Sequence, residues 1–258
     1  MSSNSPRLAC RFAPSRFIDP ASARVHARVG ISACLQGIRV RYDGADQLFP
    51  AIDVLATALE LVPICPEVGA GLTVPRPPVR LLSSDNGLRA VGRDDPSLDV
   101  TALLQRHAEQ SLPQWRDDLC GYLWKSRSPS CGLGSTPVFN RDGVQTARSD
   151  GIQAAHFRRE MPWLPCVEET ALDTPAAIDA FVLACRLFFD LRKHAKHELA
   201  RVHAHYRFVW QRSALEVQKE LSDYSEINAH ENYLTAFMRA CGRIQREELL
   251  QLFTTSAD

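Results

Sequence analysis

The sequence contains no CxxC pair, no long uninterrupted apolar segment and no net charge. Without CxxC, the usual spacings of zinc knuckles and of thioredoxin-like proteins are missing. The longest apolar runs, such as AIDVLATALELVPIC, contain acidic residues and end near a proline, so we expect no membrane span. The 30 basic residues balance the 30 acidic ones. No overall positive field would therefore attract nucleic acid, which argues against it as a partner.

A secretory signal is also missing. Residues 1–28 are rich in Ser, Pro and Arg and lack an apolar block. We predict a disordered extension here, and a transit peptide is the open alternative. The chain has eight cysteines, but a disulfide framework is typical of small secreted chains. We therefore expect a reducing compartment, the cytoplasm, where thiols serve metal binding, redox chemistry or simple burial.

Strand and helix patterns alternate through the first two thirds of the chain. Short apolar runs predict strands within residues 28–35, 61–72, 119–126 and 163–169. Helical spacing of apolar residues predicts helices over residues 48–61, 99–115 and 150–162, and the Asp-Asn-Gly turn within residues 79–92 predicts a hairpin. This alternation favours an α/β fold with a mainly parallel sheet flanked by helices.

The pattern changes after residue 171. From there to the end of the chain, apolar residues follow helical spacing and no strand pattern occurs. We therefore predict an α/β domain over residues 29–171, followed by an all-α C-terminal domain over residues 172–258.

Three cysteines share one position in this pattern. Cys34, Cys65 and Cys131 each lie at or just past the C-terminal end of a predicted strand, the edge where ligand sites gather in open α/β sheets. Three converging thiolates could bind an iron–sulfur cluster, and because a cubane cluster normally takes four, one iron would stay open. The alternative is that each cysteine is a small core residue. We expect this for the other cysteines of the folded region, which are Cys120, Cys166, Cys185 and Cys241.

Three longer motifs surround these cysteines: VGISACLQGIRVRYDG, LVPICPEVGAGLTVPRPPVRL and GYLWKSRSPSCG. Together they resemble the signature of the thiouracil desulfidase family, over about residues 29–169. The resemblance implies a 4Fe-4S cluster whose free iron takes sulfur from thiolated uracils. It also implies that the cluster ligands are Cys34, Cys65 and Cys131.

The resemblance further implies catalytic roles for Glu67, in the motif CPE, and for Ser128, the first serine of SPSC. In our hypothesis, Glu67 is the general base for a water that attacks the ring carbon of the substrate. Ser128 would hydrogen-bond the substrate or relay a proton. The products are an oxygenated base and sulfide, with no net redox change. The structural alternatives are a surface acid for Glu67 and a turn former for Ser128.

Four further residues are candidates for contacting a small thiolated base, nucleoside or nucleotide. Arg41, Tyr42 and Asp43 would line the substrate cavity, with Tyr42 stacking on the pyrimidine ring. Arg76 follows a proline within VPRPP, which suits aiming a guanidinium at a phosphate. An exposed turn and a solvated loop arginine are the alternatives.

Two other functions stay open. In the first, the protein is a non-enzymatic zinc or iron–sulfur sensor or interaction protein, whose fourth metal position is closed by Cys120 or a histidine. In the second, paired cysteines perform thiol redox chemistry, which the missing CxxC disfavours. The sequence gives no oligomeric state.

Overall fold

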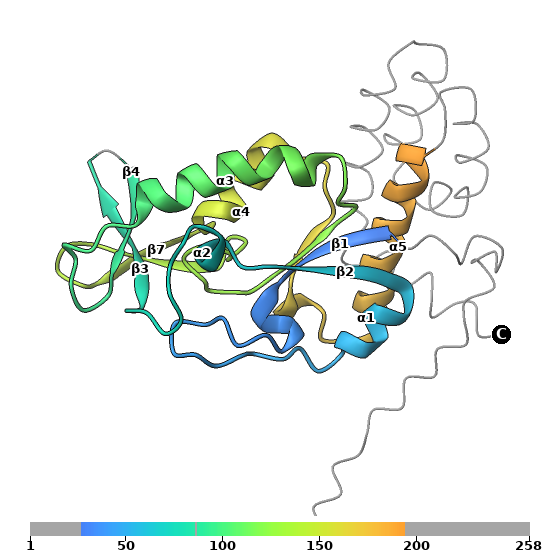
Figure 1. Ribbon diagram of the computed structural model, residues 1–258, viewed down its shortest axis with the longest axis horizontal. Helices are drawn as coiled ribbons and strands as arrows, with labels where there is room; N and C mark the ends of the chain where they lie inside the picture. Colours follow the sequence, from blue (N-terminus) through green and yellow to red (C-terminus); the bar gives the residue numbers. More distant parts are fainter. Residues whose placement is uncertain (1–26, 86, 194–258) are drawn as a thin grey trace, which may run out of the picture.

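The computed structural model describes residues 27–85 and 87–193 (Figure 1). The predicted N-terminal extension therefore lies almost wholly outside the described residues, as does most of the predicted helical domain. No helix within the described ranges is long and apolar enough to cross a bilayer.

A four-stranded parallel sheet forms the centre of the fold. In spatial order it consists of β2 (Leu59–Ile64), β1 (Ala27–Ser32), β5 (Tyr122–Trp124) and β8 (Cys166–Glu168). All three neighbouring pairs are parallel. β1 and β5 are buried along almost their whole length, as expected for central strands covered on both faces. The predicted α/β class is confirmed.

A second, mixed sheet was not predicted. It has the order β4 (Gly87–Gly92), β3 (Val79–Ser84), β6 (Thr136–Phe139) and β7 (Gln145–Ser149). The β3–β4 hairpin matches the expected one, whereas β6 and β7 form a further antiparallel hairpin. The sequence pattern missed β7 because its residues, QTARS, are exposed and lack an apolar face.

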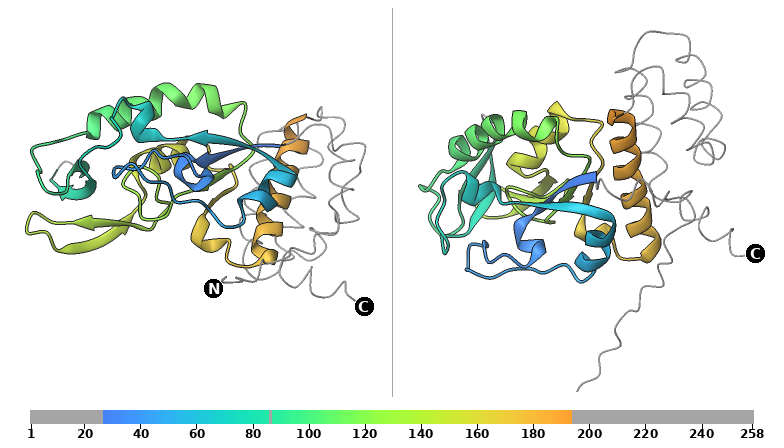
Figure 2. Two further views of the ribbon diagram at one scale, coloured as in Figure 1. Left: turned by 60° about the horizontal axis from the view of Figure 1, so that its bottom comes forward. Right: turned by 45° about the vertical axis from the view of Figure 1, so that its right-hand side comes forward.

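The helices cover both faces of the parallel sheet (Figure 2). One face carries α3 (Thr101–Arg116) and α4 (Ile152–Glu160), and the other carries α1 (Ile52–Ala58) and α5 (Pro175–Lys193). Short helical turns follow three strands: η2 (Ala33–Gln36), α2 (Pro66–Gly69) and η3 (Glu169–Ala171).

The helix predicted over residues 48–61 is shorter in the structure. α1 ends at Ala58, and the next residues pair with β1 as strand β2. Pro63 lies within β2. A proline is tolerated there because β2 is an edge strand, and no neighbouring strand needs a hydrogen bond on its open side. Pairing along the edge of the sheet therefore overrode the helical spacing.

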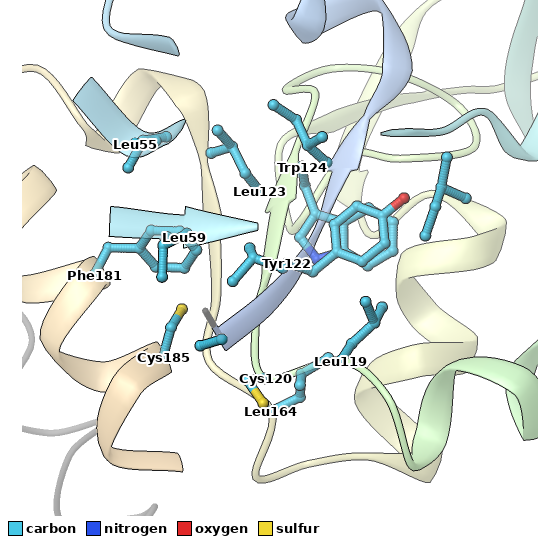
Figure 3. Close-up of a cluster of buried hydrophobic side chains, with 14 of the residues drawn as sticks. Leu55, Leu59, Leu119, Cys120, Tyr122, Leu123, Trp124, Leu164, Phe181 and Cys185 are labelled. Carbon is cyan, nitrogen blue, oxygen red and sulfur yellow. The ribbon is translucent and has the colours of Figure 1, made fainter. Parts of the chain in front are cut away.

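The main core fills both sides of the parallel sheet (Figure 3). Tyr122 and Trp124 pack against Phe157 of α4 on one side. Phe181 and Cys185 of α5 belong to the same buried cluster. The described part of the predicted helical domain thus packs onto the α/β core, and the boundary near residue 172 stays a prediction.

Candidate functional site

The strand register brings the three predicted ligand cysteines to one edge of the parallel sheet. Ser32, the last residue of β1, pairs with Ile64, the last residue of β2. Cys65 follows Ile64 directly, and Cys34 lies two residues after Ser32. β5 pairs with the other side of β1, and Cys131 lies in the loop after β5. The three cysteines therefore follow three adjacent strands at the same edge.

Electrostatic coupling places the three thiols near one another. Burial and, to a smaller extent, the neighbouring Cys65 raise the pKa of Cys34 to about 11. Burial also raises the pKa of Cys131 well above its usual value, with Cys65 and Cys34 adding to the effect. In the metal-free protein these thiols are neutral, so a bound metal centre would have to displace their protons.

The described residues contain no preformed site for a single metal ion. Within residues 27–85 and 87–193, no three His, Cys, Asp or Glu side chains lie close enough together to hold one metal ion. The thiolate ligands of a four-iron cluster attach to different iron atoms, so their sulfurs stand farther apart than around one ion. Cys120 lies at the opposite end of β5, where its N–H bonds the Arg28 carbonyl at 2.7 Å. It is therefore misplaced to close a fourth position.

Glu67, two residues after Cys65, forms a buried ion pair with Arg76. Arg76 Nε and Nη2 both lie 2.7 Å from Glu67 Oε2. Only 5% of the Arg76 side chain and 13% of the Glu67 side chain are exposed. Ser130 Oγ donates a hydrogen bond to the other oxygen, Glu67 Oε1, at 3.0 Å. The carboxylate is thus held between the loop that contains Arg76 and the loop that contains Cys131.

Arg76 also binds the loop that follows Cys34. Its Nη2 donates to the Val40 carbonyl at 3.0 Å, and its backbone N–H donates to the Tyr42 carbonyl at 2.9 Å. A continuous polar network therefore connects all three cysteine loops through Arg76. The guanidinium points inward to these partners, a geometry that favours a positioning role over the predicted contact with substrate.

Ser128 organises the backbone around Cys131. Its Oγ accepts the N–H groups of Ser130, at 3.3 Å, and Cys131, at 3.1 Å. These two bonds use the acceptor capacity of the hydroxyl and leave its hydrogen free to donate to a ligand. Ser128 thus stabilises the turn, as in the structural alternative, and its hydroxyl hydrogen can still donate to a bound ligand.

The same loop caps the N-terminus of α4. The N–H groups of Ile152 and Gln153 donate to the carbonyls of Pro129 and Ser130, at 2.9 and 3.0 Å, which satisfies two donors that a helix N-terminus leaves open. Gly151 permits this approach, because a Cβ there would lie 2.5 Å from the Ser130 carbonyl carbon. Glycine is therefore required at this position for the loop to reach the helix.

Arg41, Tyr42 and Asp43 form a surface turn. The Arg41 guanidinium lies 5.6 Å from the centre of the Tyr42 ring, and Asp43 Oδ1 accepts the Ala45 N–H at 3.0 Å. That bond, with Arg41 nearby, lowers the pKa of Asp43 below its usual value. The turn is connected to the site by the bond between Tyr42 and Arg76, and a contact with substrate stays a prediction for these three residues.

A cavity of about 360 Å³ adjoins the three-cysteine edge. Its walls come from β2, α2 and α3, and include the polar side chains of His107, Ser111 and Gln114. Of the predicted site residues, Cys65 alone contributes to these walls. This volume lies at the lower end of the range typical of small-molecule sites.

Comparison with known proteins identifies the family. A sequence model described as 2-thiouracil desulfurase matches residues 29–169, more than half of the chain. The chain belongs to the 2-thiouracil desulfurase family. The protein YbbK of Bacillus subtilis (strain 168), whose name states no function, is 30% identical over 110 residues, 40% of this chain and 72% of YbbK. A solved structure titled as a [4Fe-4S]-dependent thiouracil desulfidase, TudS, is 32% identical, with a TM-score of 0.49 over 62% of this chain and 99% of that chain.

Two acidic residues, Glu168 and Glu169, hold the Cys131 loop in place. The sequence reasoning missed both. Glu169 pairs with Lys125, with Nζ and Oε1 2.5 Å apart, and accepts the Ser126 N–H at 2.7 Å. Glu168 accepts the Leu133 N–H at 2.6 Å. Glu168 is the last residue of the fourth parallel strand, β8, and Glu169 follows it, at the edge that bears the cysteines. The sequence VEE at that strand end was the available signal.

Proposed function

We propose that the protein is an iron–sulfur-dependent desulfidase that hydrolyses the carbon–sulfur bond of a thiolated pyrimidine. The observation that supports it is the meeting of Cys34, Cys65 and Cys131 at one sheet edge in a chain of the 2-thiouracil desulfurase family. The reaction balances without an oxidant or reductant, since water and the thiocarbonyl compound give the carbonyl compound and hydrogen sulfide.

The three cysteines would hold a 4Fe-4S cluster, which supplies a Lewis-acidic iron for the substrate sulfur when bound. Glu67 would accept a proton from the attacking water. Its carboxylate already accepts bonds from Arg76 and Ser130, and a carboxylate has about four lone-pair sites, which leaves capacity for water. Arg76, bound to Oε2, and Ser130, bound to Oε1, fix the orientation of the carboxylate.

Ser128 would bind the substrate through its free hydroxyl hydrogen. Its backbone contacts place it three residues before Cys131 with a fixed side-chain direction. The neighbouring cavity, with Gln114 and Ser111 in its walls, offers donors and acceptors for the ring edge of a pyrimidine. Comparing sulfide release from the free base, the nucleoside and the nucleotide distinguishes these three substrates. A cytoplasmic location stays a prediction.

Cluster loading and sulfide release test the proposal together. The full chain is purified and reconstituted with iron and sulfide without oxygen, and sulfide is measured with 2-thiouracil, its nucleoside and its nucleotide. Cys34→Ala, Cys65→Ala and Cys131→Ala should each lose iron and sulfide release. Cys120→Ala and Cys185→Ala are the matched controls, because both residues are buried near the start of β5, at the end away from the Cys131 loop, and they should keep both properties.

Two results would contradict the proposal. A colourless protein that binds zinc and releases no sulfide would instead support the sensor hypothesis. Retention of full iron content in a Cys34, Cys65 or Cys131 variant would remove that residue from the ligand set.

A further inference from the structure

The ring of Tyr122 is fixed within the core beneath the three-cysteine edge. Tyr122 is fully buried, at 0% exposure. Its ring stacks on Trp124, with centroids 3.5 Å apart and planes 11° apart, and meets the Phe157 ring edge-on at 5.7 Å. Gly30 on the neighbouring strand β1 leaves it room, because a Cβ there would lie 2.5 Å from Tyr122 Cδ2. Figure 3 shows the phenol lying along the Trp124 indole. The hydroxyl direction is therefore set by packing.

The Tyr122 hydroxyl is buried without a hydrogen-bond partner among the described residues. A buried polar group without a partner is costly, and phenylalanine would fill the same space without that cost. Most buried polar groups in folded proteins are paired. An orphan such as Tyr122 Oη therefore indicates a partner that the polypeptide itself does not supply.

The surroundings of the hydroxyl indicate what that partner is. Tyr122 belongs to one buried cluster with Cys34 and Cys131. Burial chiefly raises the pKa of the Tyr122 phenol, and the nearby Cys131, Cys65, Cys166 and Cys34 raise it further. Three of these four are the proposed cluster ligands. Burial raises the pKa of the Cys166 thiol, and Trp124, the other ring of the stack, opposes this shift through its N–H. Tyr122 is thus an unpaired donor in the same buried cluster as Cys34 and Cys131, on the strand that the Cys131 loop follows.

We propose that the Tyr122 hydroxyl donates a hydrogen bond to a sulfur atom of the iron–sulfur centre held by Cys34, Cys65 and Cys131. This inference rests on the proposed function, since it requires that centre. Hydrogen bonds to cluster or cysteine sulfur stabilise the centre and raise its reduction potential. Tyr122 is in this view a positioning residue for the cofactor, and it takes no part in the hydrolysis itself.

Tyr122→Phe tests this because it removes one oxygen atom and keeps the ring. In the metal-free chain, the variant should have a melting temperature equal to or above that of the wild type, because the orphan is gone. In the loaded chain, iron release to a chelator should be about two- to tenfold faster, as expected for the loss of one hydrogen bond. The reduction potential of the centre should also become more negative. Thr57→Val, which alters an exposed threonine of α1, is the control and should leave both values unchanged.

The possible outcomes separate this inference from the proposed function. Equal destabilisation of the metal-free and loaded forms by Tyr122→Phe would show a purely structural hydroxyl and overturn the inference. So would an unchanged release rate and potential in a wild-type protein that binds the cluster. A wild-type chain that takes up no cluster would overturn the proposed function and this inference with it.

Discussion

The buried pair of Arg76 and Glu67 gives the sharpest test of how the site is built. Arg76→Met removes the guanidinium and leaves the Glu67 carboxylate at 13% exposure with Ser130 as its remaining partner. Breaking a buried ion pair from one side costs about 3–5 kcal/mol. Because water can reach part of the carboxylate, we expect a loss of about 3 kcal/mol in the free energy of unfolding.

A double-mutant cycle isolates the pair from the other contacts of Arg76. Arg76→Met, Glu67→Gln and the double variant are unfolded in urea in the metal-free state, followed by circular dichroism. Because the two groups share one buried contact, the coupling free energy should be about 2 kcal/mol. Iron content after reconstitution is measured on the same variants, and it should fall in each because the network joins the loops of all three cysteines.

An exposed pair of the same chemistry is the control. Arg89 Nη2 lies 2.6 Å from Asp99 Oδ2, and these side chains are 43% and 33% exposed. The cycle of Arg89→Met with Asp99→Asn should give a coupling below about 1 kcal/mol, as exposed pairs do. If the Arg76 cycle gave no larger coupling than the Arg89 cycle, the reasoning from burial would be refuted.

Three further predictions concern single residues. Gly151→Ala places a Cβ 2.5 Å from the Ser130 carbonyl carbon and 2.8 Å from the Cys131 nitrogen, so it should cost about 1–3 kcal/mol in urea unfolding and reduce iron per chain; normal loading would contradict this. Ser128→Ala removes the acceptor of two N–H groups and should lower the stability of the metal-free chain by about 1–2 kcal/mol, and an unchanged melting temperature would be the contrary result. Burial raises the pKa of Asp179 from 3.8 to about 6, so the folded state favours its protonated form; this contribution is complete below pH 3.8 and is lost as the pH rises through 6. Asp179→Asn should therefore stabilise the protein at pH 7 by about 1 kcal/mol, a value reduced for partial exposure, and by less at pH 4. An equal gain at both pH values would refute the shift.

Sequence reasoning located the elements that carry a strong local pattern. The apolar runs of β1 and β5 are buried at the centre of the sheet, so their composition alone predicts two strands. β7 is exposed and carries no such mark. Its position depends on pairing with β6, a contact that no local pattern records.

The site divides in the same way. The positions of Cys34, Cys65 and Cys131, each after a predicted strand, made their meeting possible, because parallel strands present their carboxyl ends at one edge. The resemblance of the surrounding motifs to the desulfidase family then favoured it. The partner of Glu67 was not predictable. From the sequence, Arg76 was either a substrate contact or a solvated loop residue. In the structure it bonds Glu67 and the Val40 carbonyl.

The sequence by itself determined the fold class and the family and predicted the three ligand cysteines, because these depend on local periodicity and on contiguous motifs. Only the tertiary structure decided that Arg76 is buried in an ion pair and that the Tyr122 hydroxyl lacks a partner. Both facts depend on how segments far apart in the chain pack against one another. Burial and pairing set the free energy of a polar group, and a linear pattern records neither.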